Sequence, residues 1–295
     1  MARTARRIAE TAILSTAILA LTAGTALSAD PVPAEPSFEP APMRSVLLGA
    51  GVSIAPEYEG SDEYRVGGFP IFSFDTGVPG PRRFEFRALD DIRLHVARLN
   101  GFSFGPIGGY RFGRDEDDAD ILAGLGDIDG GVVGGAFVAY DFSISEGSTL
   151  GVDVGISRQF SGDALDENVP GNAAFDGDFG FIVDFGASAN LALSPRASLA
   201  LRVGAEYASD DYMDTHFGIN AAQAANSPTL GAFDAEAGIK NVYANANLAF
   251  DVTERIQVRA GGGYSRLVGD AADSPVSVSD NQFSGSLGVG YRFKF

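Results

Sequence analysis

Apolar and polar residues alternate along most of the chain from residue 45 onward. The clearest case is the last segment, 282–295, whose odd positions are mostly apolar, among them Leu287 and Val289, while its even positions are small or polar. A period of two over this length indicates a strand with one apolar and one polar face. A strand that ends on an aromatic residue, here Phe295, is typical of bacterial outer-membrane barrels. The alternative for this segment alone is an edge strand of a soluble β-sandwich.

The same alternation recurs in eleven earlier segments, and these carry charged residues on the polar face. The segments are 46–54, 66–74, 84–88, 92–96, 102–110, 136–142, 150–156, 179–191, 199–207, 242–250 and 256–260. Asp153, Asp184 and Arg202 stand in mid-strand, opposite the apolar positions. A sandwich would bury the apolar faces in a shared core, whereas a barrel turns them to lipid and the polar faces to its lumen. Charges in mid-strand on several consecutive segments favour an all-β, antiparallel, up-and-down transmembrane barrel.

The lengths of the connections predict the number of strands. Short connections (76–81, 143–148, 193–197, 252–254) alternate with long ones (58–64, 114–130, 162–178, 209–240, 269–281), as expected for periplasmic turns and outer loops. The alternation holds throughout only if Leu89, Asp90 and Asp91 turn the segment 84–96 into a hairpin. We therefore predict twelve strands, with ten as the alternative. The last strand should close against 46–54 and place Tyr291, Phe293 and Phe295 in the periplasmic aromatic girdle, where they would serve membrane targeting.

The N-terminal segment predicts export. Arg3, Arg6 and Arg7 precede an uncharged stretch that ends in small residues at Ala29, which is the pattern of a secretory signal peptide over 1–29. The apolar run is too short and too weak for a membrane-spanning helix. Residues 30–44 are rich in proline and predict an extended periplasmic lead-in, which leaves 45–295 for the barrel. The expected location is the outer membrane of a Gram-negative cell.

Composition agrees with this class and excludes others. The chain has no cysteine, so it carries no disulfide framework and no lipoprotein anchor, and its 38 glycines suit curved, close-packed strands. The formal net charge of −18 excludes a nucleic-acid-binding protein, which needs a basic surface.

Charged residues suggest two further features. Lumen-facing Arg83, Arg87, Arg93 and Arg202 should pair with Asp153, Asp184 and Glu206 in a transverse network, which suits a narrow, closed barrel. In an outer loop, Asp115, Asp117, Asp118 and Asp120 are weak candidates for a divalent cation, but the spacing misses the EF-hand pattern, and a solvated acidic loop is the preferred interpretation. The loop could also bridge through cations to lipopolysaccharide, or Arg114 could pin it over the barrel mouth.

Candidate catalytic residues are few. An outer-membrane lipid hydrolase would need a serine with a histidine base, and the only histidines are His95 and His216. His95 is expected to be a polar lumen residue, and His216 a hydrogen-bonding loop residue near Ser209. Neither a Gly-x-Ser-x-Gly nor a His-Glu-x-x-His motif occurs. We therefore expect no enzyme and no cofactor.

An ordered set of short motifs covers the region from 45 to 295. It comprises Pro56, Tyr58, Glu59 and Gly60; Gly113, Arg114 and Asp115; Gly126 and Asp127; Asp211, Tyr212, Phe217 and Gly218; and Gly269, Asp270, Asp273, Ser274 and Pro275. In this order the set resembles the MipA/OmpV family of outer-membrane proteins. The resemblance implies an outer-membrane barrel without catalytic residues.

The same resemblance implies a function and partners. The founding member is a scaffold between a murein lytic transglycosylase and a murein synthase, so a structural or scaffolding role is expected here. Other members of the family are described as adhesins or antibiotic-associated barrels. A small solute channel or an adhesin is therefore the alternative, and a lipid hydrolase a distant one. Membrane lipid, lipopolysaccharide and the barrel-assembly machinery are the further expected partners.

Overall fold

The computed structural model describes residues 45–75, 84–174 and 177–294. The predicted signal peptide, the proline-rich lead-in, Arg83 and Phe295 lie outside these residues. No helix in the described part of the chain is long and apolar enough to cross a membrane.

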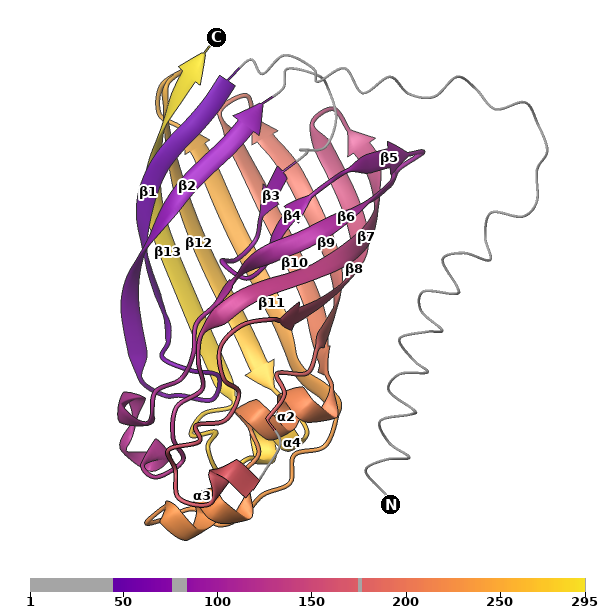
Figure 1. The fold of residues 1–295 in the computed structure, drawn as a ribbon. Helices are drawn as coiled ribbons and strands as arrows, with labels where there is room; N and C mark the ends of the chain where they lie inside the picture. The colour runs from indigo at the N-terminus through magenta and orange to yellow at the C-terminus, as the bar shows by residue number, and fades with distance from the viewer. Residues whose placement is uncertain (1–44, 76–83, 175–176, 295) are drawn as a thin grey trace, which may run out of the picture. The chain divides into compact units, whose positions relative to one another are not determined.

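Thirteen strand segments form one antiparallel sheet that curls into a barrel (Figure 1). They are β1 (Ser45–Pro56), β2 (Tyr64–Asp75), β3 (Phe84–Phe86), β4 (Ile92–Leu94), β5 (Ala97–Leu99), β6 (Phe102–Arg111), β7 (Gly131–Ser145), β8 (Ser148–Gln159), β9 (Ile182–Ser194), β10 (Ala197–Ala208), β11 (Gly238–Asp251), β12 (Ile256–Leu267) and β13 (Asn281–Lys294). Because β4 and β5 both pair with β6, they form one interrupted strand of the wall. The prediction of twelve antiparallel strands is thus confirmed.

The first and last strands close the barrel on one side. In the ladder between β1 and β13, Val46 pairs with Phe293 and Ile54 with Gly285, as the sequence predicted. On the other side of β1, its neighbour β2 forms no ladder with β3 within the described residues. There the Phe72 ring of β2 lies 5.3 Å from the ring of Phe84, so aromatic side chains join the two strands. The barrel is therefore nearly, but not fully, closed by backbone hydrogen bonds.

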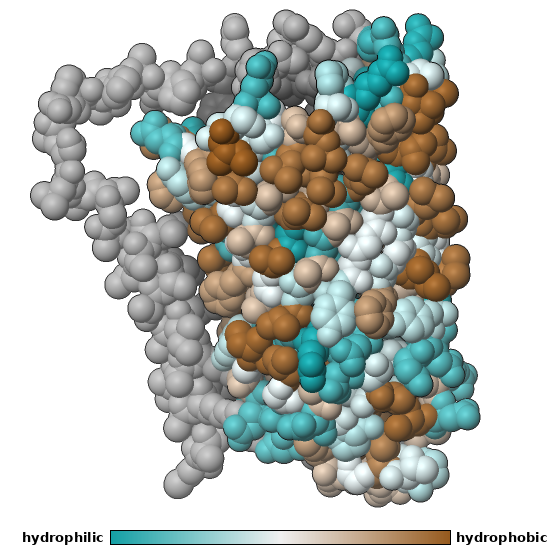
Figure 2. All heavy atoms as spheres, turned by 180° about the vertical axis from the view of Figure 1, so that it is seen from behind, coloured by the Kyte–Doolittle hydropathy of each residue, from teal (hydrophilic) through white to brown (hydrophobic). Residues whose placement is uncertain are grey.

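The period-two pattern places apolar side chains outside and polar ones inside. On β13, Phe283, Leu287 and Val289 are each more than half exposed, and on β10 Val203 is 55% exposed. Figure 2 shows hydrophobic side chains across the strands and more hydrophilic ones toward the end that carries the helices. In water such a surface would be costly, whereas lipid covers it without penalty.

The turns match the prediction more closely than the lengths of some strands do. Asp91 donates its backbone N–H to the Ala88 carbonyl (3.3 Å), which makes the predicted hairpin turn between β3 and β4. Each of these strands is only three residues long, shorter than the predicted 84–88 and 92–96. Strand β9 begins at Ile182 and not at Phe179, because the Phe179 side chain is buried with Ile128 and Ala164 in a loop cluster.

Candidate functional site

A network of arginines and aspartates crosses the lumen. Asp153 of β8 accepts hydrogen bonds from Arg87 (2.9 Å), from Arg93 of β4 (2.6 Å) and from Arg202 of β10. Arg93 and Arg202 also bind Asp184 of β9, whose carboxylate accepts a further bond from the Tyr243 hydroxyl of β11. These side chains come from opposite walls, so the network spans the interior. The predicted transverse pairing is thus found for Arg87, Arg93 and Arg202 with the two aspartates, whereas Arg83 lies outside the described residues.

The centre of the network is buried. The side chains of Arg93 and Asp153 are only 1% and 2% exposed. Buried ion pairs of this kind cost much desolvation and are kept only when most of their hydrogen bonds are satisfied, as here. Glu206 departs from the prediction, because it pairs with Lys240 (2.9 Å) at the outer end of the barrel and not with the arginines. The lumen is thus filled at this level by side chains held in fixed geometry.

The long loops fold into a cap over the outer end of the barrel. They contain three short α-helices, α2 (Asp210–His216), α3 (Ala221–Asn226) and α4 (Asp270–Asp273), which gather at the end opposite the C-terminal end of β13 (Figure 1). Three 3-10 helices, η2 (Glu116–Asp118), η3 (Asp120–Leu122) and η4 (Asn172–Ala174), join them. The sequence pattern, in which strands dominate, did not predict these helices.

The cap has a hydrophobic core of its own. Phe217, Ala235, Ala271 and Val276 have no exposed surface, and Leu122 packs with them from a different loop. Segments from four outer loops, those after β1, β6, β10 and β12, therefore share one core. Such a core holds the loops together over the barrel mouth and does not leave them as separate, solvated segments.

A buried lysine joins the cap to the barrel wall. The Lys240 ammonium at the start of β11 contacts the carboxylates of Glu59 and Glu206, and its side chain is 2% exposed. Glu59 also accepts a hydrogen bond from the Tyr212 hydroxyl of α2 (2.9 Å). Burial opposes the charge of Glu59, but Lys240 and the Tyr212 hydrogen bond outweigh it and lower the pKa of this carboxyl. The pKa of Tyr212 is raised, first by burial and then by Glu59, so the phenol remains a donor.

Arg114 pins an outer loop to α2. Its Nη1 donates to the carbonyl oxygen of His216 (3.0 Å), and the side chain is buried. The prediction that Arg114 holds its loop over the barrel mouth therefore agrees with the structure, although the acceptor is a backbone carbonyl. Burial lowers the pKa of Arg114 to about 10, so the guanidinium stays charged at neutral pH.

His216 is held without a charge beside this arginine. Its ring stacks on Tyr212 with centroids 4.2 Å apart, and its Nε2 is buried without a hydrogen-bond partner. Burial, followed by the positive charges of Arg111, Arg114 and Lys240, lowers the pKa of His216 well below its usual range. Ser209 caps α2 by accepting the Tyr212 N–H, and the unpartnered His216 Nε2 makes no hydrogen bond to it.

The residues of the family-like motifs are concentrated in the cap and at its attachment to the barrel. The Tyr58 hydroxyl donates to the Val276 carbonyl (3.3 Å), and the Ser274 hydroxyl donates to the Phe217 carbonyl. Gly60 has a φ of +103°, and a Cβ there would lie 2.9 Å from the Cα of Ser277. These contacts join the first, fourth and last outer loops. The motif residues therefore hold the cap together, although Tyr58 and its acceptor Val276 lie 218 positions apart in the chain.

The remaining motif residues lie at the ends of the same loops. Gly113 approaches the Ile128 carbonyl so closely that a Cβ would lie 2.1 Å from its oxygen. Asp270 accepts the Glu236 N–H (2.7 Å), and Gly126 and Gly269 have φ values of +74° and +57°. Pro56 ends β1, Asp211 lies in the first turn of α2, Gly218 follows it, and Asp273 and Pro275 flank Ser274 at the end of α4.

The acidic loop uses some of its carboxylates for local hydrogen bonds. Asp118 accepts the Asp115 N–H (3.0 Å), Asp127 accepts the Glu116 N–H (2.8 Å), and Glu116 accepts N–H groups from Gly124 and Gly126. Among the described residues, no three His, Cys, Asp or Glu side chains come together in a way that could hold a metal ion. The cation candidates Asp115, Asp117, Asp118 and Asp120 therefore stay a prediction.

One histidine does meet a serine inside the barrel. His95 Nδ1 lies 3.0 Å from Ser103 Oγ, and His95 Nε2 lies 3.5 Å from a Glu85 oxygen. The order Glu–His–Ser is that of a hydrolase triad. However, Ser103 is only 1% exposed and pairs with Arg98 on one side and Ala139 on the other, so its hydroxyl is buried in the wall. The contact agrees with the predicted polar lumen role of His95.

The predicted targeting residues lie at the other end of the barrel. Tyr291 and Phe293 of β13 are 40% and 44% exposed, and their ring centroids lie 4.9 Å apart. Arg255 donates to the Tyr291 hydroxyl (3.1 Å) from the turn after β11. Their placement fits an aromatic girdle, and their targeting role remains a prediction.

Sequence reasoning missed the buried lysine site. Lys240, Tyr243 and Asn241 belong to β11, which was interpreted mainly by its apolar face. The available signal was Lys240 itself, which stands at the start of an alternating segment in a chain with few basic residues. Its two partners could not be found from spacing, because Glu59 lies 181 positions away.

Comparison with known proteins identifies a family. A family model described as MltA-interacting protein MipA matches residues 48–293. No curated protein sequence matches the chain.

Several solved outer-membrane barrels are similar at low identity. The NanC porin shares 10% identity over 84% of this chain and 98% of its own, with a TM-score of 0.40. An outer-membrane channel from Pseudomonas putida F1 shares 13% over 90% and 100% (TM-score 0.43). The translocator domain of the autotransporter NalP from Neisseria meningitidis shares 12% over 97% of both chains (TM-score 0.33). These likenesses are too weak to support an argument about function.

Proposed function

Because this chain belongs to the MipA family of outer-membrane β-barrel proteins, we propose that it is a closed interaction barrel and not a constitutive pore. The observation that carries the proposal is the double closure of the lumen. Arg93, Asp153 and Arg202 cross the interior, and the cap covers the outer mouth with a common hydrophobic core. A pore for steady solute flow needs an open, hydrated path, and both closures oppose one.

Recording in planar bilayers tests this closure. The purified wild-type barrel is expected to give no steady conductance, whereas the double variant Asp153→Ala/Arg202→Ala should give unstable, small openings because the lumen network is cut. Arg158→Ala/Asp178→Ala is the matched control, because this exposed ion pair at the outer end (2.9 Å) lies outside the lumen network. A reproducible open state of the wild-type protein would contradict the proposal.

The partners that we propose are murein enzymes. The family description names an MltA-interacting protein, and a lytic transglycosylase and a murein synthase are the partners that this name suggests for our chain. The described periplasmic turns are short, so docking would rely on their rims and on the lead-in 30–42, which lies outside the described residues. Crosslinking in cell envelopes should recover a murein enzyme with the full chain. If no murein enzyme is recovered, the proposed scaffold function is contradicted. If deletion of 30–42 leaves the recovery unchanged, the lead-in does not dock the enzyme.

Two other functions are weaker. A gated solute channel is favoured by the polar lumen, and a wild-type conductance that appears on a stimulus would support it. We propose that the barrel is not an enzyme, since the single His–Ser contact is sealed from substrate. An adhesin role would act through the cap, and binding of the purified barrel to host cells would test it. Membrane lipid, lipopolysaccharide and the barrel-assembly machinery remain proposed partners.

A further inference from the structure

The backbone ladder that joins β4 and β5 to β6 is interrupted near Pro106. Strand β4 pairs with β6 only at Ile92–Gly108 and Arg93–Ile107, and pairing resumes in β5 at Ala97–Phe104. Three residues of one strand therefore stand opposite two of the other, which is a β-bulge. Pro106 lies within this stretch and has no backbone N–H to donate to a ladder. The backbones stay in contact beside it, because Val96 donates its N–H to the Phe104 carbonyl (3.0 Å) and a Cβ on Gly105 would lie 1.7 Å from the Leu94 carbonyl oxygen.

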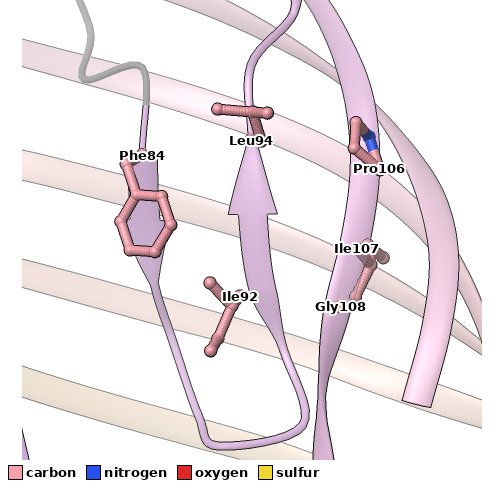
Figure 3. A pocket seen from close by; sticks show the side chains of 6 residues that line it. All are labelled: Phe84, Ile92, Leu94, Pro106, Ile107 and Gly108. Carbon is pink, nitrogen blue, oxygen red and sulfur yellow. The ribbon is translucent and has the colours of Figure 1, made fainter. Parts of the chain in front are cut away.

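On the outer face beside this bulge lies an open apolar pocket of about 370 Å³. It is lined by Phe84, Ile92, Leu94, Pro106, Ile107 and Gly108, so no polar side chain faces it (Figure 3). Of these residues, Phe84, Ile92, Leu94, Pro106 and Gly108 lie on the outward-facing register of their strands, and Leu94 is 45% exposed. The pocket is shallow and wide open on its outer side, so a ligand there would lie along the wall.

The pocket continues toward the seam between β2 and β3. The Phe72 ring lies 5.3 Å from Phe84 and 5.6 Å from Phe86, so three rings line the wall where the described residues form no ladder. An apolar chain lying in the pocket would contact these rings along its length. None of the six described residues that line the pocket has a polar side chain.

We propose that this pocket is a binding site for one fatty acyl chain of a membrane phospholipid. Its outward register opens it to the bilayer, and its purely carbon lining matches an acyl chain in chemistry. The compact residues Pro106 and Gly108 leave room there beside the larger side chains of Phe84, Ile92 and Leu94.

The position of the pocket along the barrel axis indicates which leaflet of the membrane it faces. Pro106 stands four residues after Phe102, where β6 leaves its periplasmic turn. At about 3.3 Å per residue and a tilt of about 40°, it lies about 10 Å above that turn, within a band about 25 Å tall. The pocket therefore faces the periplasmic leaflet, whose lipids are phospholipids.

Native mass spectrometry of the barrel, refolded in lipid-free detergent, tests the site. The probe is dipalmitoyl phosphatidylethanolamine, with palmitate and lipid A as separate arms. Gly108→Phe should fill the pocket, because a Cβ there meets nothing closer than 4.0 Å. Gly262→Phe is the matched control: Gly262 also faces outward, on β12, and its nearest atom lies at 3.9 Å. Ile92→Trp fills the pocket from the other strand, should Gly108→Phe fail to fold.

The expected result is one phospholipid retained by the wild-type and Gly262→Phe barrels. Gly108→Phe or Ile92→Trp should lower the retained fraction at least about tenfold, as expected for losing the burial of two methylene groups. Equal retention by all the variants would reduce the binding to ordinary lipid contact and overturn the site. Absence of a retained phospholipid on the wild-type barrel, or retention of palmitate or lipid A alone, would also overturn it.

Discussion

Acid is expected to loosen the outer cap, and His216 is the reason. Its ring packs on Tyr212 and faces the positive groups of Arg111, Arg114 and Lys240, which come from β6, the loop after β6 and β11. A proton on His216 would therefore add a fourth charge to a buried, positive environment, and its Nε2 has no partner to share the proton. The carboxylates of Glu59 and Glu206 are already paired with Lys240.

The size of the effect follows from the direction of the pKa shift. The opened cap takes up the proton at the ordinary value of 6.5, while the closed cap takes it up only well below that value. Above pH 6.5 the neutral histidine makes its full contribution to the free energy that favours the closed cap. Below pH 6.5 this contribution falls by about 1.4 kcal/mol per pH unit. Between pH 7.5 and 5.0 the loss is about 2 kcal/mol, or about thirtyfold in the ratio of open to closed caps.

Thiol labelling can measure this ratio, because the chain has no cysteine of its own. Ala271 of the cap core is 0% exposed, so Ala271→Cys reacts only when the cap opens. Ala225→Cys, on the exposed side of α3, corrects for the change of thiol reactivity with pH. The ratio of the two labelling rates should rise about thirtyfold from pH 7.5 to 5.0.

The variant His216→Phe decides whether this histidine is responsible. Phenylalanine keeps a ring against Tyr212 and cannot take a proton, so the rise in the labelling ratio should disappear in this background. Glu59 does not interfere, because its pKa lies below 4.5 in the closed cap and its effect on stability begins at lower pH. If wild type and His216→Phe show the same pH dependence, the reasoning is refuted.

Three further substitutions test the cap and its attachment. Lys240→Met should cost about 1–3 kcal/mol in chemical denaturation, because two partly exposed carboxylates lose their buried counter-ion. A loss under 1 kcal/mol would contradict the account. Phe217→Ala should cost about 3–5 kcal/mol through a cavity in the cap core, whereas Phe283→Ala on the lipid face should cost much less when the same unfolding curves are compared. Gly60→Ala should cost about 1–3 kcal/mol, since a φ of +103° strains an L-residue. In the Ala271→Cys background this substitution should speed thiol labelling, because the cap opens more often. An unchanged labelling rate would argue against a strained turn at Gly60.

Much of the barrel could be predicted because the alternation within each strand shows which of its side chains face lipid. A side chain on a strand alternates between two environments, so Leu287 and Val289 reveal the lipid face without knowledge of their neighbours. The turn at Leu89–Asp91 was predicted correctly, since it was needed to keep the termini on one side. The three-residue lengths of β3 and β4 were not predicted, because they depend on how this hairpin packs against β6.

The cap could not be predicted in the same way. Its helices are too short for a period to emerge, and they are stable only because Tyr212, Met213 and Phe217 enter a core shared with other loops. The motif residues marked where that core would form but not what each would contact. Arg114 illustrates the limit, since its acceptor on α2 lies 102 positions away.

The sequence by itself therefore determined the compartment, the strand pattern, the polarity of the two faces and the family. These properties depend on periodicity and on motifs that are local in the chain. Only the tertiary structure decided that the lumen is crossed by Arg93, Asp153 and Arg202, that Lys240 anchors the cap and that Pro106 opens a pocket to the membrane. Each of these features depends on contacts between strands and loops that are distant in the chain, and the register of the barrel strands determines those contacts.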